Sequence, residues 1–134
     1  MKLVVDSNVV FTFFWKKSVA RELFLKQDLE LYSPEFALEE ISKYSDEIIF
    51  KTKTTPEEFN KIKKELLVLV DFIPLKEYAD YLQHAAKITP DKDDVDFVAL
   101  SLKLKCPIWS NDNEIRNQAH FKVLTTKEVI GLFD

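Results

Sequence analysis

Short apolar runs alternate with helix-like segments along the chain. The run Leu3-Val4-Val5 is rich in β-branched residues and free of polar ones, which is typical of a parallel strand buried on both faces. Further strands are predicted at residues 29–32, 71–75, 107–110 and 121–124. Helices are predicted between them, and this alternation indicates a parallel sheet with right-handed crossovers.

Polar residues mark the starts of the predicted helices. Ser18 is expected to cap one helix, and the pairs Ser33-Pro34 and Thr55-Pro56 each join a hydroxyl cap to a proline at the first helical position. The helix after Thr55 is expected to run to about Val70. Later helices are predicted at residues 77–87, 94–103 and 113–118, and after a Thr126 cap.

Composition narrows the class of protein. The 134 residues are expected to form one domain, 1–134, without a linker. No apolar run approaches the roughly 18 residues of a membrane span, and no signal-peptide cleavage site follows the first strand, so a cytoplasmic protein is expected. The one cysteine, Cys106, is expected to be a small buried hydrophobe. With Gly131 as its one glycine, the chain has no Gly-rich phosphate loop.

Acidic residues follow two of the predicted strands. Asp6 comes directly after Leu3-Val4-Val5, and Asp112 follows the strand that ends at Ser110. In open parallel sheets, ligands bind in the crevice beyond the carboxyl ends of the strands. The two carboxylates are therefore candidates for one site.

Helical phase separates two neighbouring glutamates. At about 100° per residue, Glu40 is displaced by roughly 80° from the apolar stripe that runs from Ala37 through Tyr44 to Ile48, and Glu39 by roughly 180°. Glu39 is expected to face water, whereas Glu40 can point into a crevice. Two ordinary surface glutamates are the alternative, and this segment alone leaves it open.

The same angular argument applies to the acidic residues at the start of the helix predicted at residues 94–103. Around the axis of that helix, Asp94 lies roughly 40° from the centre of the face that points into the protein, Asp93 roughly 60° and Asp96 about 120°. Asp94 is thus the best inward acid, while Asp91 and Asp93 are expected to cap free N–H groups. Asp96 either does the same or lies at the rim of a site.

A cluster of such acids predicts a metal. Four carboxylates within a few ångströms would repel one another at neutral pH, and no lysine or arginine stands beside Asp6 or Asp112 in sequence. Mg²⁺ or Mn²⁺ would neutralise the cluster, because hard cations take oxygen ligands. His84 and His120 are too far apart in sequence to predict a histidine site. The net charge of −4 also argues against a broad basic face for nucleic acid.

Four segments, in this order, resemble the PIN domain, the metal-dependent ribonuclease fold of VapC-like toxins in prokaryotic toxin–antitoxin pairs. They are Val4 to Asn8, Ser33 to Ile41, Asp91 to Ser101, and Ile108 to Asp112. The resemblance spans nearly the whole chain. It implies a three-layer α/β/α fold whose central parallel sheet has about five strands, with the first and fourth strands adjacent.

The resemblance also implies an acidic quartet, which consists of Asp6, Glu40, Asp94 and Asp112. Within it, Asp6, Asp94 and Asp112 would be metal ligands, and Glu40 a ligand or the group that orients the attacking water. Asp96 stands where the family often has proline or an apolar residue. The resemblance therefore leaves Asp94 and Asp96 open as the main ligand.

Supporting residues are implied beside the quartet, namely Asn8, Ser110 and Glu114. The function implied is Mg²⁺- or Mn²⁺-dependent hydrolysis of phosphodiester bonds in single-stranded RNA, with no protein nucleophile.

Three cations near the first strand are candidates for phosphate contacts: Lys16, Lys17 and Arg21. Trp15 could stack on a base, although an aromatic in this segment is more often core or dimer interface. The expected partners are RNA, an antitoxin protein and a second copy of the chain in a homodimer, and no membrane.

Two other functions stay open. A haloacid-dehalogenase-type phosphatase also has an acid after its first strand, but it needs a second aspartate two residues later, where this chain has Asn8. The other is an inactive PIN-like module that binds RNA or a protein without cleaving it. The presence of all four acids weighs against that module.

Overall fold

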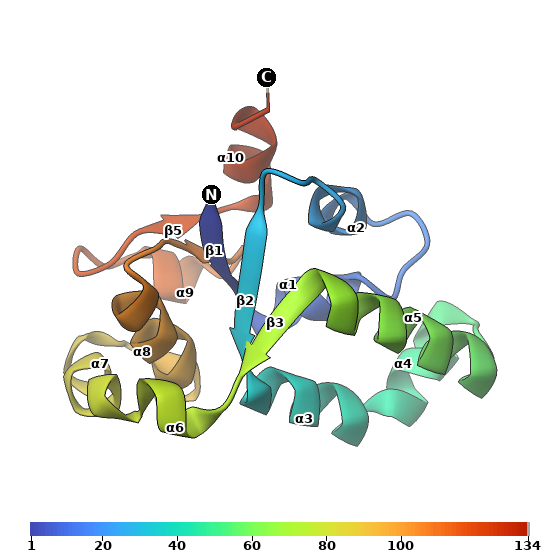
Figure 1. Cartoon of the computed structure of the whole chain (residues 1–134), viewed down its shortest axis with the longest axis horizontal. Helices are drawn as coiled ribbons and strands as arrows, with labels where there is room; N and C mark the ends of the chain where they lie inside the picture. Colours follow the sequence, from blue (N-terminus) through green and yellow to red (C-terminus); the bar gives the residue numbers. More distant parts are fainter. Residues whose placement is uncertain (134) are drawn as a thin grey trace.

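The strands form one parallel sheet whose order reverses at β1. The computed structural model describes residues 1–133, and its strands are β1 Lys2–Val5, β2 Glu30–Pro34, β3 Val70–Ile73, β4 Ile108–Trp109 and β5 Val123–Leu124. Their order across the sheet is β3-β2-β1-β4-β5, and neighbouring strands are parallel. Helices flank both faces (Figure 1). The predicted three-layer α/β/α fold is confirmed, with β1 and β4 adjacent.

The helices lie between successive strands, except the last helix, which follows β5. They are α1 Ser7–Thr12, α2 Val19–Phe24, α3 Glu35–Lys43, α4 Ser45–Thr52, α5 Pro56–Leu69, α6 Leu75–Tyr78, α7 Leu82–Ile88, α8 Val95–Leu104, α9 Asn113–Arg116 and α10 Thr126–Gly131, with 3₁₀ turns η1 Ala79–Tyr81 and η2 Lys92–Asp94. None of the helices within residues 1–133 is long and apolar enough to cross a membrane.

The central strand separates two apolar clusters. Leu3 and Val5 belong to the cluster that contains Trp109, whereas Val4 belongs to the one that contains Leu100. Successive side chains of a strand point to opposite faces, and helices cover both faces here, so all three strand residues are fully buried. The unbroken apolar run of β1 is thus explained by its place at the centre of the sheet.

The reversal of strand order places the end of β1 beside the end of β4. From β1 the chain moves to β2 and β3 on one side, and later returns to β4 and β5 on the other. Val5 is paired with Trp109, and the backbone N–H of Asp6 donates to the Trp109 carbonyl at 3.0 Å. Such a switch point opens a crevice at the carboxyl ends of the strands. Asp6 is the first residue beyond that edge.

Two predicted helix caps are wrong. Ser33 lies in β2, which stays paired with β3 as far as Pro34, so α3 begins at Glu35. The buried Ser33 hydroxyl instead donates to the Val5 carbonyl at 2.9 Å. The last helix is capped by Thr125 and not by Thr126, because the Thr125 hydroxyl accepts from the Glu128 N–H in a capping box.

Several predicted boundaries also shift. The backbone turns at Tyr44 (φ −102°, ψ 18°) and divides the expected single helix into α3 and α4, so Tyr44 leaves the buried stripe and is 41% exposed. The helix expected at 77–87 is divided by η1 after the buried Tyr78. β3 starts at Val70, one residue before the predicted start. Cys106 is half-buried, not fully buried as predicted.

Replacing Ser33 with alanine is expected to lower the free energy of unfolding by about 1 kcal/mol, because it removes a buried hydrogen bond between adjacent strands. Urea denaturation of Ser33→Ala measures the change. The matched control is Ser42→Ala, since Ser42 is exposed and bonds only the flexible Lys63 ammonium. Equal loss in both variants would contradict a strand-linking role for Ser33.

Candidate active site

Asp6 is a nearly buried carboxylate at the end of the central strand. It is 6% exposed, and its Oδ2 accepts a hydrogen bond from the Ser110 hydroxyl at 2.8 Å. Burial is the largest cause that raises the pKa of Asp6 above its ordinary value. The Ser110 hydrogen bond opposes this, and the charges of Asp112 and Glu40 add to it. Asp6 therefore lies within the electrostatic field of two further acids from distant parts of the chain.

Ser110 links the two strand-exit acids. Its hydroxyl donates to Asp6 and accepts the backbone N–H of Asp112 at 3.1 Å. Asp112 then caps α9, because its Oδ1 accepts from the Glu114 N–H at 2.9 Å. One oxygen of Asp112 is thus held by the helix start. The buried serine fixes the spacing of the β1 and β4 exits.

Glu40 approaches the same crevice from α3. Its Oε1 accepts a hydrogen bond from the Ser7 hydroxyl at 2.9 Å, and Ser7 is the first residue of α1 after Asp6. Glu40 is half-buried, whereas Glu39 is exposed. The helical-phase argument therefore agrees with where the two side chains lie.

Asp94 carries the largest resolved perturbation among the acids. Its pKa is raised to about 7, first by burial and then by the charges of Asp6, Asp91, Asp112 and Asp93. Asp94 is half-buried at the start of α8. At neutral pH this carboxyl is poised between its charged and neutral forms. A nearby cation would favour the charged form.

An open, polar cavity of about 500 Å³ receives these groups. Its lining comes from the β1 exit, α1, α3 and the start of α8, and consists of Asp6, Ser7, Asn8, Phe36, Glu40, Lys43, Tyr44, Asp93, Asp94 and Phe97. Asp6, Glu40 and Asp94 thus share one cavity, and Asp112 is joined to Asp6 from the adjoining strand exit.

Asp96 points elsewhere. The Tyr78 hydroxyl donates to its Oδ2, and both residues line a separate small cavity with Glu39. Burial, together with the hydrogen bond to Asp96, raises the pKa of the Tyr78 phenol. Asp96 therefore connects α8 to α6, and Asp94 is the acid of this pair that faces the cavity of Asp6.

Other predicted residues fall in different places. Asn8 lines the cavity, whereas Glu114 is exposed on α9. Lys16 and Lys17 are exposed between α1 and α2. The Arg21 guanidinium lies 5.2 Å from the centre of the Phe13 ring and pairs with Glu65 at 3.4 Å, so it is engaged within the fold.

Sequence reasoning missed Ser7 and Lys43. Ser7 bonds Glu40 directly, and its polar side chain beside Asp6 was a signal that went unused. Lys43 follows Glu40 by three residues and therefore shares its helix face. It brings a cation to the acidic cavity. Asp91, expected to cap, does accept the Asp93 N–H at 3.0 Å.

The candidate ligands are of the chemical type that a hard divalent cation prefers, but the side chains lie too far apart to hold one together. Within residues 1–133, no three acidic, histidine or cysteine side chains are drawn together closely enough to hold a metal ion. The available donors at the cavity are carboxylate oxygens, which Mg²⁺ and Mn²⁺ favour. The raised pKa values of Asp6 and Asp94 reflect burial and repulsion that a cation would offset. Binding would require these side chains to draw together.

Comparison with known proteins gives a family and a fold. The sequence matches the PIN domain family over residues 4–129. None of the curated proteins matches it significantly. Among solved structures, the fold is similar to a chain in the crystal structure of VapBC2 from Rickettsia felis bound to a DNA fragment from their promoter. That similarity has a TM-score of 0.62 and 12% sequence identity, and it covers 93% of this chain and 98% of that chain.

Asp94 is expected to make the metal-free protein less stable as the pH rises. The pKa of Asp94 in the folded protein, about 7, exceeds its ordinary value of 3.8. Protonation of Asp94 therefore favours the folded protein. This contribution to the free energy of unfolding is fully present below about pH 4 and is lost as the pH rises through 7. Asp94→Asn should therefore raise the melting temperature at pH 8 and change it little at pH 4. Thermal unfolding in EDTA measures this, with the exposed Asp80→Asn as control. A gain that does not vary with pH would contradict the assignment.

Proposed function

The chain belongs to the PIN domain family, and we propose that it is a Mg²⁺- or Mn²⁺-dependent endoribonuclease that hydrolyses phosphodiester bonds of single-stranded RNA. The observation that carries the proposal is the buried Asp6 carboxylate, which is tied through Ser110 to Asp112 and faces a cavity shared with Glu40 and Asp94. Such a group of desolvated acids suits metal-assisted hydrolysis. No protein nucleophile is required.

The proposed metal ligands are Asp6, Asp94 and Asp112. When bound, a divalent cation lowers the pKa of a water molecule and offsets charge on the scissile phosphate. Ser110 holds the Asp6 Oδ2 toward β4, and the Asp6 carboxylate also lines the cavity. Asp94 is preferred over Asp96 because the Asp96 carboxylate is engaged by Tyr78.

Glu40 is proposed to orient the attacking water. Its Oε1 is held by the Ser7 hydroxyl, so its second oxygen can accept a hydrogen bond from a water at the cavity. Ser7 is a positioning residue in this scheme, as is Ser110 for Asp6. Asn8 and Lys43 line the cavity, and the Lys43 ammonium is suited to a phosphate of the bound strand. Contacts from Lys16, Lys17 and Arg21, and a supporting role for Glu114, stay predictions.

We also propose that the protein is a toxin of a toxin–antitoxin pair. The similarity of its fold to a chain of the VapBC2 structure supports an antitoxin protein as partner. A homodimer and a cytoplasmic location, where RNA is available, complete the proposal.

A binding module without catalysis is the second candidate. The observation that favours it is the open arrangement of the acids, since no three of them within residues 1–133 are close enough to hold a metal. This candidate predicts RNA or protein binding that is indifferent to divalent cations. A phosphatase would instead hydrolyse small phosphate monoesters and leave RNA intact.

Mn²⁺ is expected to raise the melting temperature, because a ligand at about 100 times its Kd adds roughly 2.7 kcal/mol to the free energy of unfolding. Asp6→Asn should remove most of this gain and leave the metal-free protein at least as stable, since it removes a repelling charge. Scanning and titration calorimetry measure the two effects. Mn²⁺ binding that is undiminished in Asp6→Asn would contradict the assignment of Asp6 as a metal ligand.

RNA cleavage is expected to require Mg²⁺ or Mn²⁺ and to stop in EDTA. Glu40→Gln should slow it by about a hundredfold, because the attacking water loses its orientation, and Asp94→Asn and Asp112→Asn should slow it at least as much. Glu39→Gln is the matched control, since Glu39 is exposed outside this cavity. Gel analysis of labelled RNA measures the rates.

Cleavage that persists in the Asp94 and Asp112 variants, purified in parallel, would reveal a contaminating nuclease. Equal losses in Glu39→Gln and Glu40→Gln would refute the role of Glu40. Hydrolysis of phosphate monoesters with intact RNA would move the assignment to a phosphatase.

A further inference from the structure

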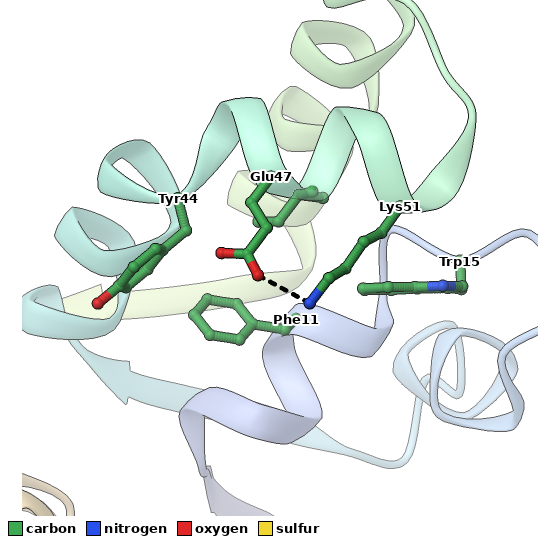
Figure 2. Close-up of a pocket in the computed structure, with 6 residues that line it drawn as sticks. Phe11, Trp15, Tyr44, Glu47 and Lys51 are labelled. Atoms are coloured by element: carbon green, nitrogen blue, oxygen red, sulfur yellow. Dashed lines mark ion pairs between the residues drawn. The ribbon is translucent and has the colours of Figure 1, made fainter.

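A second cavity adjoins the acidic one and is lined by aromatic rings. It has a volume of about 290 Å³, and its lining consists of Phe11, Trp15, Tyr44, Glu47, Ile48 and Lys51. Figure 2 shows the α4 side chains of Glu47 and Lys51 facing Phe11 and Trp15, which come from α1 and the turn after it. The Lys51 ammonium pairs with the Glu47 carboxylate at 2.7 Å. The cavity therefore offers apolar rings beside a hydrogen-bonding donor and acceptor.

The aromatic segment 11–15 divides its rings between core and cavity. Phe13 stacks on Phe24 and Phe14 stacks on Phe59, so both belong to the buried core. Trp15 is 37% exposed and Phe11 is half-buried, and both line the cavity. Of the two alternatives expected for Trp15, a core position is therefore not met, and a dimer interface stays a prediction. Its ring has a face that a ligand can reach.

Tyr44 connects this cavity to the acidic one. It lines both, because the turn between α3 and α4 places it at their junction. The preceding residue, Lys43, lines the acidic cavity, and its ammonium lies 5.4 Å from the centre of the Tyr44 ring. A strand with one phosphate at the carboxylates would thus lead directly past Tyr44 toward Trp15.

We propose that this cavity binds an unpaired nucleobase of the RNA strand next to the cleaved phosphate. The inference deepens the proposed function and rests on it for the placement of that phosphate. Single-stranded RNA is recognised by stacking of bases on aromatic rings and by hydrogen bonds to their edges. Trp15 and Phe11 supply the stacking surface, and Glu47 and Lys51 can bond the base edge. The Lys43 charge complements the phosphate at the acidic cavity.

A nucleobase suits this lining better than an apolar protein side chain. An apolar side chain would cover the rings but would also bury part of the Glu47–Lys51 pair without replacing its hydrogen bonds to water. A base has both a flat apolar face and polar edges. The continuity with the acidic cavity through Tyr44 adds a reason that applies to a substrate strand.

Binding of a short single-stranded RNA in EDTA tests the proposal without depending on cleavage. A ribose-phosphate oligomer of the same length without bases serves as the second probe. Trp15→Ala should weaken RNA binding by about tenfold, the effect of losing one stacked base, and should leave the abasic oligomer unaffected. Trp15→Phe should retain most of the affinity. Phe50→Ala is the control, since Phe50 is 84% exposed on α4 outside the cavity.

Tryptophan fluorescence gives an independent readout. Trp109 is fully buried, so quenching by RNA in the unaltered protein should come from Trp15 and be absent with the abasic oligomer. The proposal would be overturned if the RNA does not bind or if the RNA and the abasic oligomer bind equally. It would also be overturned if Trp15→Ala and Phe50→Ala bind the RNA with equal affinity, and that result would favour a protein as the occupant of the cavity. Failure of metal-dependent cleavage with base-dependent binding intact would overturn the nuclease function alone.

Discussion

The parallel pairing of β1 with β4 is the constraint on which the candidate site depends. The register joins Val5 to Trp109, so the next residue of each strand leaves the sheet at the same edge. These residues are Asp6 and Ser110, and the Ser110 hydroxyl donates a hydrogen bond to the Asp6 carboxylate. A shift of one residue would exchange the β1 side chains between the two apolar clusters and would move Asp6 out of register with Ser110. The packing of the core and the position of the central acid are therefore fixed together.

The acids are retained at a cost to the stability of the metal-free fold. Asp6 and Asp94 both have raised pKa values, first because they are buried and then because neighbouring carboxylates repel them. Hydrogen bonds from Ser110 to Asp6 and from Ser7 to Glu40 hold two of the acids without neutralising them. This is the electrostatic pattern of a functional site, where perturbed pKa values gather. It is also the reason a divalent cation fits the proposed chemistry.

The turn at Tyr44 gives the site its extent. A continuous helix from α3 into α4 would carry Tyr44 on the buried stripe with Ala37 and Ile48, as the apolar spacing predicts. The turn instead exposes Tyr44 at the junction of the acidic and aromatic cavities. The proposed phosphate and base sites thus follow from one local departure from helical geometry.

Short-range patterns in the sequence predicted the parallel sheet and two acids at strand exits, and left Glu40 as a candidate. The layered fold with adjacent first and fourth strands was implied by the resemblance to the PIN domain. A continuous apolar run predicts a buried strand, strand ends predict Asp6 and Asp112 at one edge, and helical phase separates Glu40 from Glu39. Only the tertiary structure decided that Ser33 bonds Val5, that Tyr78 engages Asp96, and that Ser110 joins Asp6 to Asp112. The reason is physical, since a hydroxyl or carboxyl side chain serves equally well as cap, ligand or cross-link. Its partner is chosen by residues that are distant in sequence and become neighbours only on folding.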